Sequence, residues 1–375
     1  MGDFSGITGA AGGLTALKRT GRARRGAVAA ALAVGLAAAA GCGGSSAPGP
    51  GQAVLLGTYD SSTTVGQVLD SLHPLGATSD SAGTTYLLNS PLMVGLSAAG
   101  KGSTFVATGS YFDAFGPQGL VAMPDGSVLF GHGAEVVRLD LRTGDTSVLV
   151  GDAARTRDYT APAPATATPA DIRFTKDVTP IGVSATGTVM IVDGRALWSL
   201  AAGHLTRVYQ QPAPAKGEDD TLIGAGGSVT ADGTAYVQGT RENYATLADV
   251  LVIPPHGKPT ALPLPPSIPG VSGRPADLVP AWLTSDGANG LYIHAAQASP
   301  GHGDYVLHLH DGTTTLVMSA KPSTSDAEPG TCNVHDPVDA TRFPCPLPRA
   351  LTYHAGQLVL AGEKPYAVRL LVSHR

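Results

Sequence analysis

Residues 119–130 read GLVAMPDGSVLF, and residues 181–193 read IGVSATGTVMIVD. Each stretch consists of a short run of small apolar residues, a turn that ends in glycine, and a second apolar run. A glycine in such a turn supplies the positive φ that a tight connection between two twisted strands requires. Each stretch therefore predicts an antiparallel β-hairpin.

The same unit recurs six times along the chain, which is a sign of a repeat architecture. Its first turns are Ala82-Gly83, Asp125-Gly126, Thr186-Gly187, Asp232-Gly233, Asn289-Gly290 and Ala355-Gly356. In five of the units a second glycine turn follows, at Gly100, Gly144, Gly203, Gly257 and Gly312. A strand rich in Thr, Val or Leu comes after each second turn, so each complete unit predicts a four-stranded antiparallel sheet.

The sixth unit lacks its outermost strand, because the chain ends at Arg375 soon after the strand expected near Ala367–Val372. A strand without a unit, Ala53–Gly57, stands near the other end. An N-terminal strand that completes the last sheet closes a ring and leaves no open edge between the first and last units. An open solenoid or a two-sheet sandwich could use the same strands, but neither explains this strand. We predict an all-β fold, a six-bladed β-propeller over residues 52–375 whose last blade is closed by an N-terminal strand.

Composition agrees with this fold and excludes other classes. The 49 Gly and 29 Pro make up about 21% of the 375 residues, against about 12% in average proteins, which favours turns over long helices. A content of 43% apolar and 14% charged residues indicates a folded chain rather than a disordered polyelectrolyte. The net charge of -5 offers no excess of cations for a phosphate backbone, so no nucleic-acid partner is predicted.

The two hairpins quoted first resemble the repeats of NHL-type propellers, in which a core of the form gva-x-x-dG-x-lyvaD precedes a glycine turn and an outer strand. Residues 164–167, PATA, are similar to the GGPAT element of secreted bacterial members, without its two glycines. The resemblance is best in the second and third units. It implies a six-bladed propeller carried on a secreted bacterial lipoprotein.

The N-terminal segment predicts an export signal. A basic cluster precedes residues 26–40, which carry no charge; the cluster consists of Lys18, Arg19, Arg22, Arg24 and Arg25. Fifteen helical residues span about 22 Å, short of the roughly 30 Å hydrocarbon core, so a signal peptide is favoured over a permanent membrane helix. The adjacent Arg24 and Arg25 leave both the general and the twin-arginine export routes open.

Residues 39–42 read AAGC and are followed by GGSSAPGPG, which resembles a bacterial lipobox and its flexible tether. The resemblance implies that residues 1–41 are a lipoprotein signal peptide, that Cys42 carries a diacylglycerol, and that residues 42–51 are the tether. Ala39 stands where the family usually has Leu, so plain secretion with cleavage nearby is the alternative. The expected location is the extracytoplasmic side of the cell membrane, with the membrane as a partner through the lipid anchor.

The other two cysteines, Cys332 and Cys345, bracket a loop rich in Asp and Pro. In an exported protein such a pair predicts a disulfide. The alternative is a zinc site that includes His335, but two thiols and one imidazole supply at most three ligands and lack a tight pair spacing. The disulfide is favoured.

The expected innermost strands contain no Asp, Glu or His; they lie near residues 75–78, 119–122, 181–184, 227–230, 281–284 and 351–353. Six-bladed propellers include metal-dependent lactonases and lyases. The family resemblance implies that such enzymes place carboxylates, Asn or His around the central channel. Hydroxyls and backbone carbonyls alone are a poor ligand set for a cation. We therefore predict no catalytic residue, no metal site and no cofactor.

Four aspartates lie just upstream of these strands and would gather at one mouth of a ring: Asp113, Asp177, Asp220 and Asp277. Such a rim could attract a cation or a basic ligand. The alternative is that Asp favours turns, where its side chain accepts backbone hydrogen bonds. His308 and His310 alternate on one face of an expected strand, with His302 before them. Two histidines on a short exposed strand are more typical of a solvated face than of a metal site.

The long connections are rich in Pro, Ala, Thr or Asp and are expected to be surface loops; they are Gly151–Lys176, Ala213–Asp220, Pro263–Pro275 and Lys321–Pro346. We predict that the protein is a membrane-tethered, extracytoplasmic propeller that acts as a binding or scaffold module, with a protein or small-molecule ligand at these loops. The alternative is a metal-dependent propeller hydrolase or lyase that uses the acidic mouth.

Overall fold

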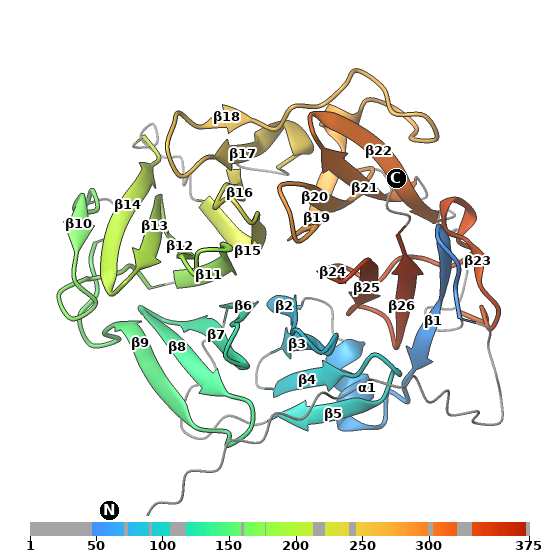
Figure 1. Cartoon of the computed structure of the whole chain (residues 1–375), viewed down its shortest axis with the longest axis horizontal. Coiled ribbons are helices and arrows are strands. Elements are labelled where there is room, and N and C mark those ends of the chain that lie inside the picture. The colour runs from blue at the N-terminus through green and yellow to red at the C-terminus, as the bar shows by residue number, and fades with distance from the viewer. Residues whose placement is uncertain are drawn as a thin grey trace, which may run out of the picture. The chain divides into compact units, whose positions relative to one another are not determined.

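The six glycine turns of the repeat each join an inner strand to its neighbour, and the strands form six antiparallel sheets around a common centre (Figure 1). The computed structural model describes residues 47–70, 74–89, 92–105, 118–158, 161–176, 178–212, 222–239, 245–298, 303–320 and 332–372. All of these belong to one of two units of the chain, Ser45–Arg375. The predicted fold class, an all-β six-bladed propeller, is confirmed.

In each of the first three blades, four strands follow the order of the chain from the centre outward, and in blade three the earlier strand β10 is added at the outer edge. Blade one contains β2 (Gly76–Ser79), β3 (Thr85–Asn89), β4 (Leu92–Leu96) and β5 (Gly102–Phe105). Blade two contains β6 (Gln118–Ala122), β7 (Ser127–His132), β8 (Glu135–Asp140) and β9 (Thr146–Gly151). Blade three contains β11 (Val178–Val183), β12 (Val189–Asp193), β13 (Ala196–Ala201) and β14 (His204–Gln210), with β10 (Thr166–Ala167) outside.

Blades four and five repeat this order, whereas blade six combines an N-terminal strand with C-terminal strands. Blade four contains β15 (Leu222–Val229), β16 (Ala235–Gly239), β17 (Val250–Ile253) and β18 (Thr260–Ala261). Blade five contains β19 (Val279–Ser285), β20 (Leu291–Ala296), β21 (Asp304–His310) and β22 (Thr313–Ala320). Blade six contains β24 (Ala350–His354), β25 (Gln357–Ala361), β26 (Tyr366–Leu371), β1 (Gln52–Thr58) and β23 (Val338–Asp339).

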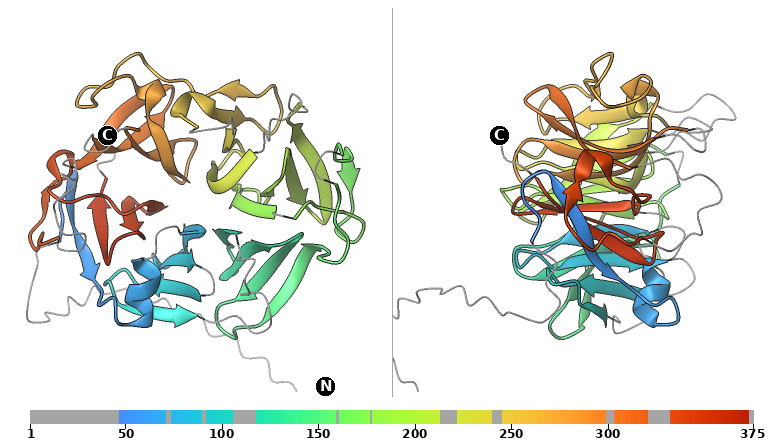
Figure 2. Two further views of the ribbon diagram at one scale, coloured as in Figure 1. Left: turned by 180° about the vertical axis from the view of Figure 1, so that it is seen from behind. Right: turned by 90° about the vertical axis from the view of Figure 1, so that its right-hand side faces the viewer.

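The ring is closed by β1, which pairs antiparallel with β26, as predicted. Ala53 lies opposite Leu370, and both side chains are fully buried. The views of Figures 1 and 2 show the blue N-terminal strand beside the red C-terminal strands. The short strand β23 pairs with the outer side of β1 over Gln52 and Ala53, so β1 is not the edge of its sheet over these residues.

The helical elements are short, as the composition predicted. Those in the described part of the chain are α1 (Thr64–Leu69) and the 3-10 turns η1 (Leu247–Asp249), η2 (Pro275–Asp277) and η3 (Ala340–Arg342). The hydroxyl of Thr63 accepts a hydrogen bond from the Gly66 amide at 3.1 Å and so caps α1, while Val68 and Leu69 are buried. Among the described residues, no helix has the length and apolar character to cross a membrane.

Cys332 and Cys345 form the predicted disulfide, with their Cα atoms 5.7 Å apart. Both cysteines are buried in the same apolar cluster as Phe343. The Phe343 amide donates to the Ser319 carbonyl of β22 at 3.0 Å. The described part of the Lys321–Pro346 connection therefore packs on blades five and six and supplies β23, whereas a surface loop was expected.

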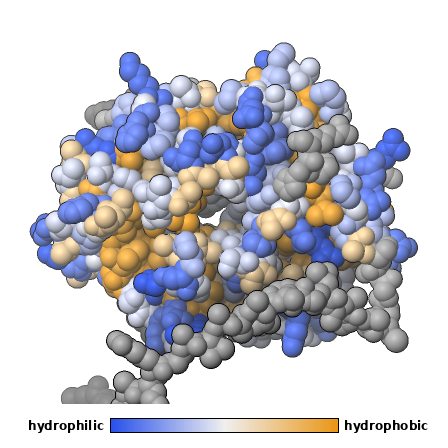
Figure 3. Space-filling view, in the orientation of Figure 1, coloured by the Kyte–Doolittle hydropathy of each residue, from blue (hydrophilic) through white to orange (hydrophobic). Residues whose placement is uncertain are grey.

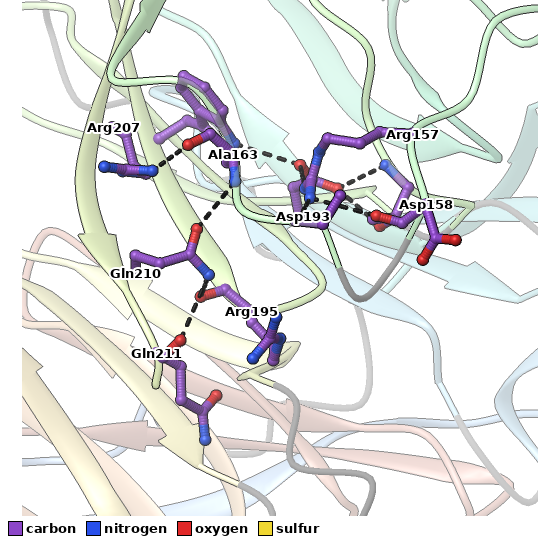
Figure 4. Close-up of polar contacts among 11 residues, drawn as sticks. Arg157, Asp158, Ala163, Asp193, Arg195, Arg207, Gln210 and Gln211 are labelled. Carbon is purple, nitrogen blue, oxygen red and sulfur yellow. Dashed lines mark hydrogen bonds and ion pairs between the residues drawn. The ribbon is translucent and has the colours of Figure 1, made fainter. Parts of the chain in front are cut away.

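The Gly151–Lys176 connection runs over the surface, as expected, and polar contacts hold it against blade three (Figure 4). Arg157 donates to the fully buried carboxylate of Asp193 at 2.8 Å. Thr175 donates to the same carboxylate through its amide at 2.7 Å and its hydroxyl at 2.6 Å. Further along, Arg207 donates to the Ala163 carbonyl, and the Ala163 amide donates to Gln210. These bonds position β10 as a fifth strand.

Candidate functional site: the central channel and its mouth

The inner strands enclose a cavity of about 340 Å³ at the centre of the ring. In Figure 3 the face toward the viewer is hollowed at this point. Glycines allow neighbouring blades to approach closely here. A Cβ on Gly76 would lie 2.6 Å from the Gly119 carbonyl carbon, and one on Gly182 would lie 2.7 Å from the Cβ of Val229. The repeat therefore places small residues where the blades converge.

The cavity lining is polar but uncharged. Its hydroxyl groups belong to Thr78, Ser79, Ser184, Ser228, Thr284, Ser285 and Tyr353, and the rest of the described lining contains no Asp, Glu, His, Lys or Arg. Some of these hydroxyls join adjacent blades: Thr78 accepts from the Ala122 amide at 3.0 Å, and Ser79 donates to Thr352 at 2.9 Å. The cavity can therefore offer hydrogen bonds to a ligand without a charged group.

Of the predicted rim, only Asp277 lies in the part of the chain that the structure describes. It ends η2 and accepts two hydrogen bonds from Arg274, both at 2.8 Å. Asp277 lines a separate cavity of about 290 Å³ rather than the channel. Asp113, Asp177, Asp220, Cys42 and His302 lie outside the described residues.

A different set of aspartates, outside the predicted rim, occupies the first turns of blades one, two, four and five. Asp80, Asp125, Asp232 and Asp286 each accept a hydrogen bond from the backbone amide two residues later, at 2.8 to 3.0 Å. This is the turn role that aspartate commonly plays. The turns of blades three, four and five lie together, because the Ala185 amide donates to the Ala231 carbonyl and the Ala231 amide to the Ala288 carbonyl.

In three of these aspartates the second carboxylate oxygen has a partner, and that partner differs from blade to blade. Asp80 accepts from the Tyr86 hydroxyl at 2.9 Å in blade one. Asp125 forms an ion pair with Arg138 in blade two. In blade five, Asp286 Oδ2 lies 3.1 Å from His308 Nε2 and 3.0 Å from His310 Nδ1.

The blade-five cluster of Asp286, His308 and His310 continues into an aromatic stack. The Tyr292 ring stacks on His308 with centroids 4.2 Å apart, and Tyr353 lies 5.3 Å from Tyr292. Tyr353 also lines the channel cavity. The cluster therefore lies beside one mouth of the channel.

Asp286 is half-buried, and its surroundings favour the ionised form. Burial alone raises the pKa of its carboxyl. The hydrogen bonds from His308, from the Ala288 and Gly290 amides and from His310 outweigh burial, and the net pKa of Asp286 is lowered. The sequence indicated that His308 and His310 share a strand face, which is confirmed by their common contact. Asp286 was not predicted, although it directly follows the innermost strand of its blade in the repeat.

No protein-family model matches the chain, and no curated protein matches its sequence. Among solved structures, a gluconolactonase from Xanthomonas campestris is similar at 14% identity, with a TM-score of 0.49 and coverage of 86% of this chain and 89% of that one. A streptogramin B lyase is similar at 13% identity, with a TM-score of 0.46 and coverage of 85% of this chain and 97% of that one. The calcium-binding protein regucalcin from Agrobacterium tumefaciens is similar at 13% identity, with a TM-score of 0.45 and coverage of 81% of this chain and 92% of that one. Likenesses of this size carry no information about activity.

Proposed function

We propose that the protein is a lipid-anchored, extracytoplasmic binding module whose channel takes a small, uncharged ligand rich in hydroxyl or amide groups. The observation that carries the proposal is the 340 Å³ cavity, whose described lining combines hydroxyls and backbone groups with apolar side chains and contains no charged one. Cavities of a few hundred Å³ with a few convergent polar groups are typical of small-molecule sites. A charged ligand would lose its hydration there without gaining an ion pair.

Binding is favoured over hydrolysis or elimination for this cavity. Both reactions need a positioned general acid or base, most often His, Asp or Glu. The described lining supplies neither an imidazole nor a carboxylate, and Asp277 of the predicted acidic mouth is engaged by Arg274 in a separate cavity.

The binding proposal can be tested with a panel of neutral mono- and disaccharides as probes, measured by thermal unfolding. A ligand that binds only the folded state raises the unfolding midpoint. The Ala231→Trp variant places a large ring at the cavity and should abolish the shift, because Ala231 lines the cavity and lies outside the buried apolar clusters. Ala261→Trp on the exposed outer strand β18 is the matched control and should keep it. The absence of a shift with every neutral sugar, or an equal shift in Ala231→Trp, would contradict the proposal.

The anchor proposal is supported by the basic and apolar N-terminal pattern and by the disulfide, since disulfides persist in oxidising compartments. The Cys42→Ala variant should leave the membrane fraction for the soluble extracytoplasmic fraction, whereas a Ser45→Ala control should stay in the membrane fraction. Continued membrane association of Cys42→Ala would mean that the N-terminal apolar segment itself is the anchor. A soluble wild-type protein would point to plain secretion.

A further inference from the structure

We propose that Asp286, His308 and His310 form a binding site for a divalent transition-metal cation, with Zn²⁺ as the best-suited ion. Three donor atoms converge: Asp286 Oδ2, His308 Nε2 and His310 Nδ1, all within 4.8 Å of one another. Ligands of a tetrahedral Zn²⁺ lie about 2.0–2.1 Å from the ion and hence roughly 3.3 Å from each other. The two observed N···O separations, 3.1 and 3.0 Å, are close to that spacing.

Blade one provides an internal comparison for this turn. Its Asp80 and Tyr86 have the same spacing as Asp286 and Tyr292, and the carboxylates accept the same pattern of two backbone amides. Tyr86 lies opposite Gly95 in the strand register, whereas Tyr292 lies opposite His308. The turn of blade one is complete without any imidazole. The two histidines of blade five are therefore not needed to form the turn.

Gly290 is a second difference between the two turns. Its amide donates to Asp286 Oδ1 at 2.9 Å, as the amide of Thr84 donates to Asp80 Oδ1 in blade one. A Cβ on Gly290 would lie 2.1 Å from Asp286 Oδ2 and 2.7 Å from His310 Nδ1. Gly290 is not among the residues with positive φ, so the backbone does not demand glycine there. Glycine instead leaves space at the donor atoms, where blade one carries the side chain of Thr84.

The donors are also held in orientation by their neighbours. The two backbone amides at Asp286 Oδ1 direct the other oxygen toward the histidines. The stacked ring of Tyr292 fixes the plane of His308. The distal nitrogen of His310 lies 3.4 Å from an oxygen of Asp311, the carboxylate that commonly supports a metal-binding histidine.

The donor set selects the class of ion. Two imidazoles and one carboxylate suit Zn²⁺ and its neighbours in the transition series, whereas Ca²⁺ and Mg²⁺ prefer oxygen ligands. Three protein donors leave one tetrahedral position for water or another ligand. The His310 side chain is 46% exposed, so that position is reachable from solvent. This site does not depend on the identity, or the existence, of a channel ligand.

The test uses the untagged full chain in detergent, stripped with a chelator and dialysed against Zn²⁺, with bound metal measured by mass spectrometry. We expect one Zn²⁺ per chain. His308→Gln and Asp286→Asn should each weaken the affinity at least tenfold, because loss of even a supporting partner costs 10- to 100-fold. Two matched controls, Asp80→Asn in blade one and His204→Gln at the exposed start of β14, should leave the affinity unchanged.

Co²⁺ loading gives an independent readout, because a site of low coordination number produces intense visible absorption bands. We expect these bands in the wild type and in His204→Gln, and their loss in His308→Gln and His310→Gln. Equal metal binding by His308→Gln and the wild type would overturn the proposal. So would binding of less than one Zn²⁺ per chain, because the site would then be too weak to fill. An equal loss in His204→Gln would overturn it as well, since the metal would then be held by scattered surface histidines.

Discussion

Leu55 of the N-terminal strand lies directly opposite Val368 of the last strand in the antiparallel pairing of β1 with β26. Directly opposite residues in such a pair have Cα atoms about 4.5–5.5 Å apart. The ring therefore closes through hydrogen bonds between segments from the two ends of the propeller sequence.

A double substitution tests this closure. Leu55→Cys with Val368→Cys should form a disulfide under mild oxidation, because the expected separation lies in the range that a disulfide spans. Thiol counting on the denatured, unreduced protein measures it. The pair Leu55→Cys with Leu358→Cys is the control, since Leu358 belongs to β25, which does not pair with β1. Free thiols at positions 55 and 368 would contradict the closure.

The Arg157–Asp193 ion pair should contribute strongly to stability. The side chains are 12% and 0% exposed, so Asp193→Asn leaves a buried cation without its counter-charge. We expect the free energy of unfolding to fall by about 3–5 kcal/mol in urea denaturation. The Asp152–Arg155 pair of the same connection, with exposed fractions of 35% and 53%, is the control. Its Asp152→Asn variant should cost about 0–1 kcal/mol. Equal losses would refute the burial argument.

The Cys332–Cys345 disulfide should stabilise the segment around residues 332–346 that packs on blades five and six. It joins cysteines 13 residues apart in sequence. A loop of this size contributes about 3 kcal/mol in the chain-entropy model. The double variant Cys332→Ser, Cys345→Ser should lose about that much in guanidinium denaturation. Reductant should lower the wild type to the same stability and leave the variant unchanged. A further loss in the reduced variant would assign the effect to something other than this bond.

The buried His294 predicts a pH dependence of stability. Burial lowers its pKa, but the charge and hydrogen bond of Asp304, 2.7 Å away, and the bond to the Arg349 carbonyl outweigh burial, so the net pKa is raised. A raised pKa means that the folded state binds this proton more tightly than the unfolded state, where histidine titrates near 6.5. This contribution is complete below about pH 6.5 and is lost as the pH rises through the folded-state pKa of His294.

Urea denaturation at a series of pH values measures this dependence. His294→Gln should remove the decline in the free energy of unfolding toward alkaline pH, whereas His256→Gln, at an exposed position, should retain it. An unchanged decline in His294→Gln would assign the titration to another group.

Much of the fold could be predicted from local chemistry. Gly126 and Gly187 adopt φ of +83° and +81° in the turns where the repeat placed them, a conformation that other residues rarely take. The closing strand was predictable because a ring with five complete sheets and one incomplete sheet needs one more strand. Both signals lie within a few residues of sequence or in a simple count of strands.

The rest depends on contacts between distant segments. The strands β10 and β23 have two residues each, too short for any sequence pattern, and exist only because β14 and β1 offer them hydrogen bonds. Asp286 meets His308 because of the pairing of three strands of blade five, with Ser285 opposite Leu291 and Tyr292 opposite His308. A shift of one residue would point the histidines to the other face.

The position of β1 between β26 and β23 also fixes the order of events when the chain is made. Residues 52–58 leave the ribosome early, yet both of their partner strands lie beyond residue 337. The first strand must therefore wait until nearly the whole polypeptide has emerged, and the final step of assembly joins segments far apart in sequence, which is slow. During that interval β1 lacks its partner strands and can pair incorrectly or aggregate. Protection of the unfolded chain before closure would therefore determine the yield of folded protein.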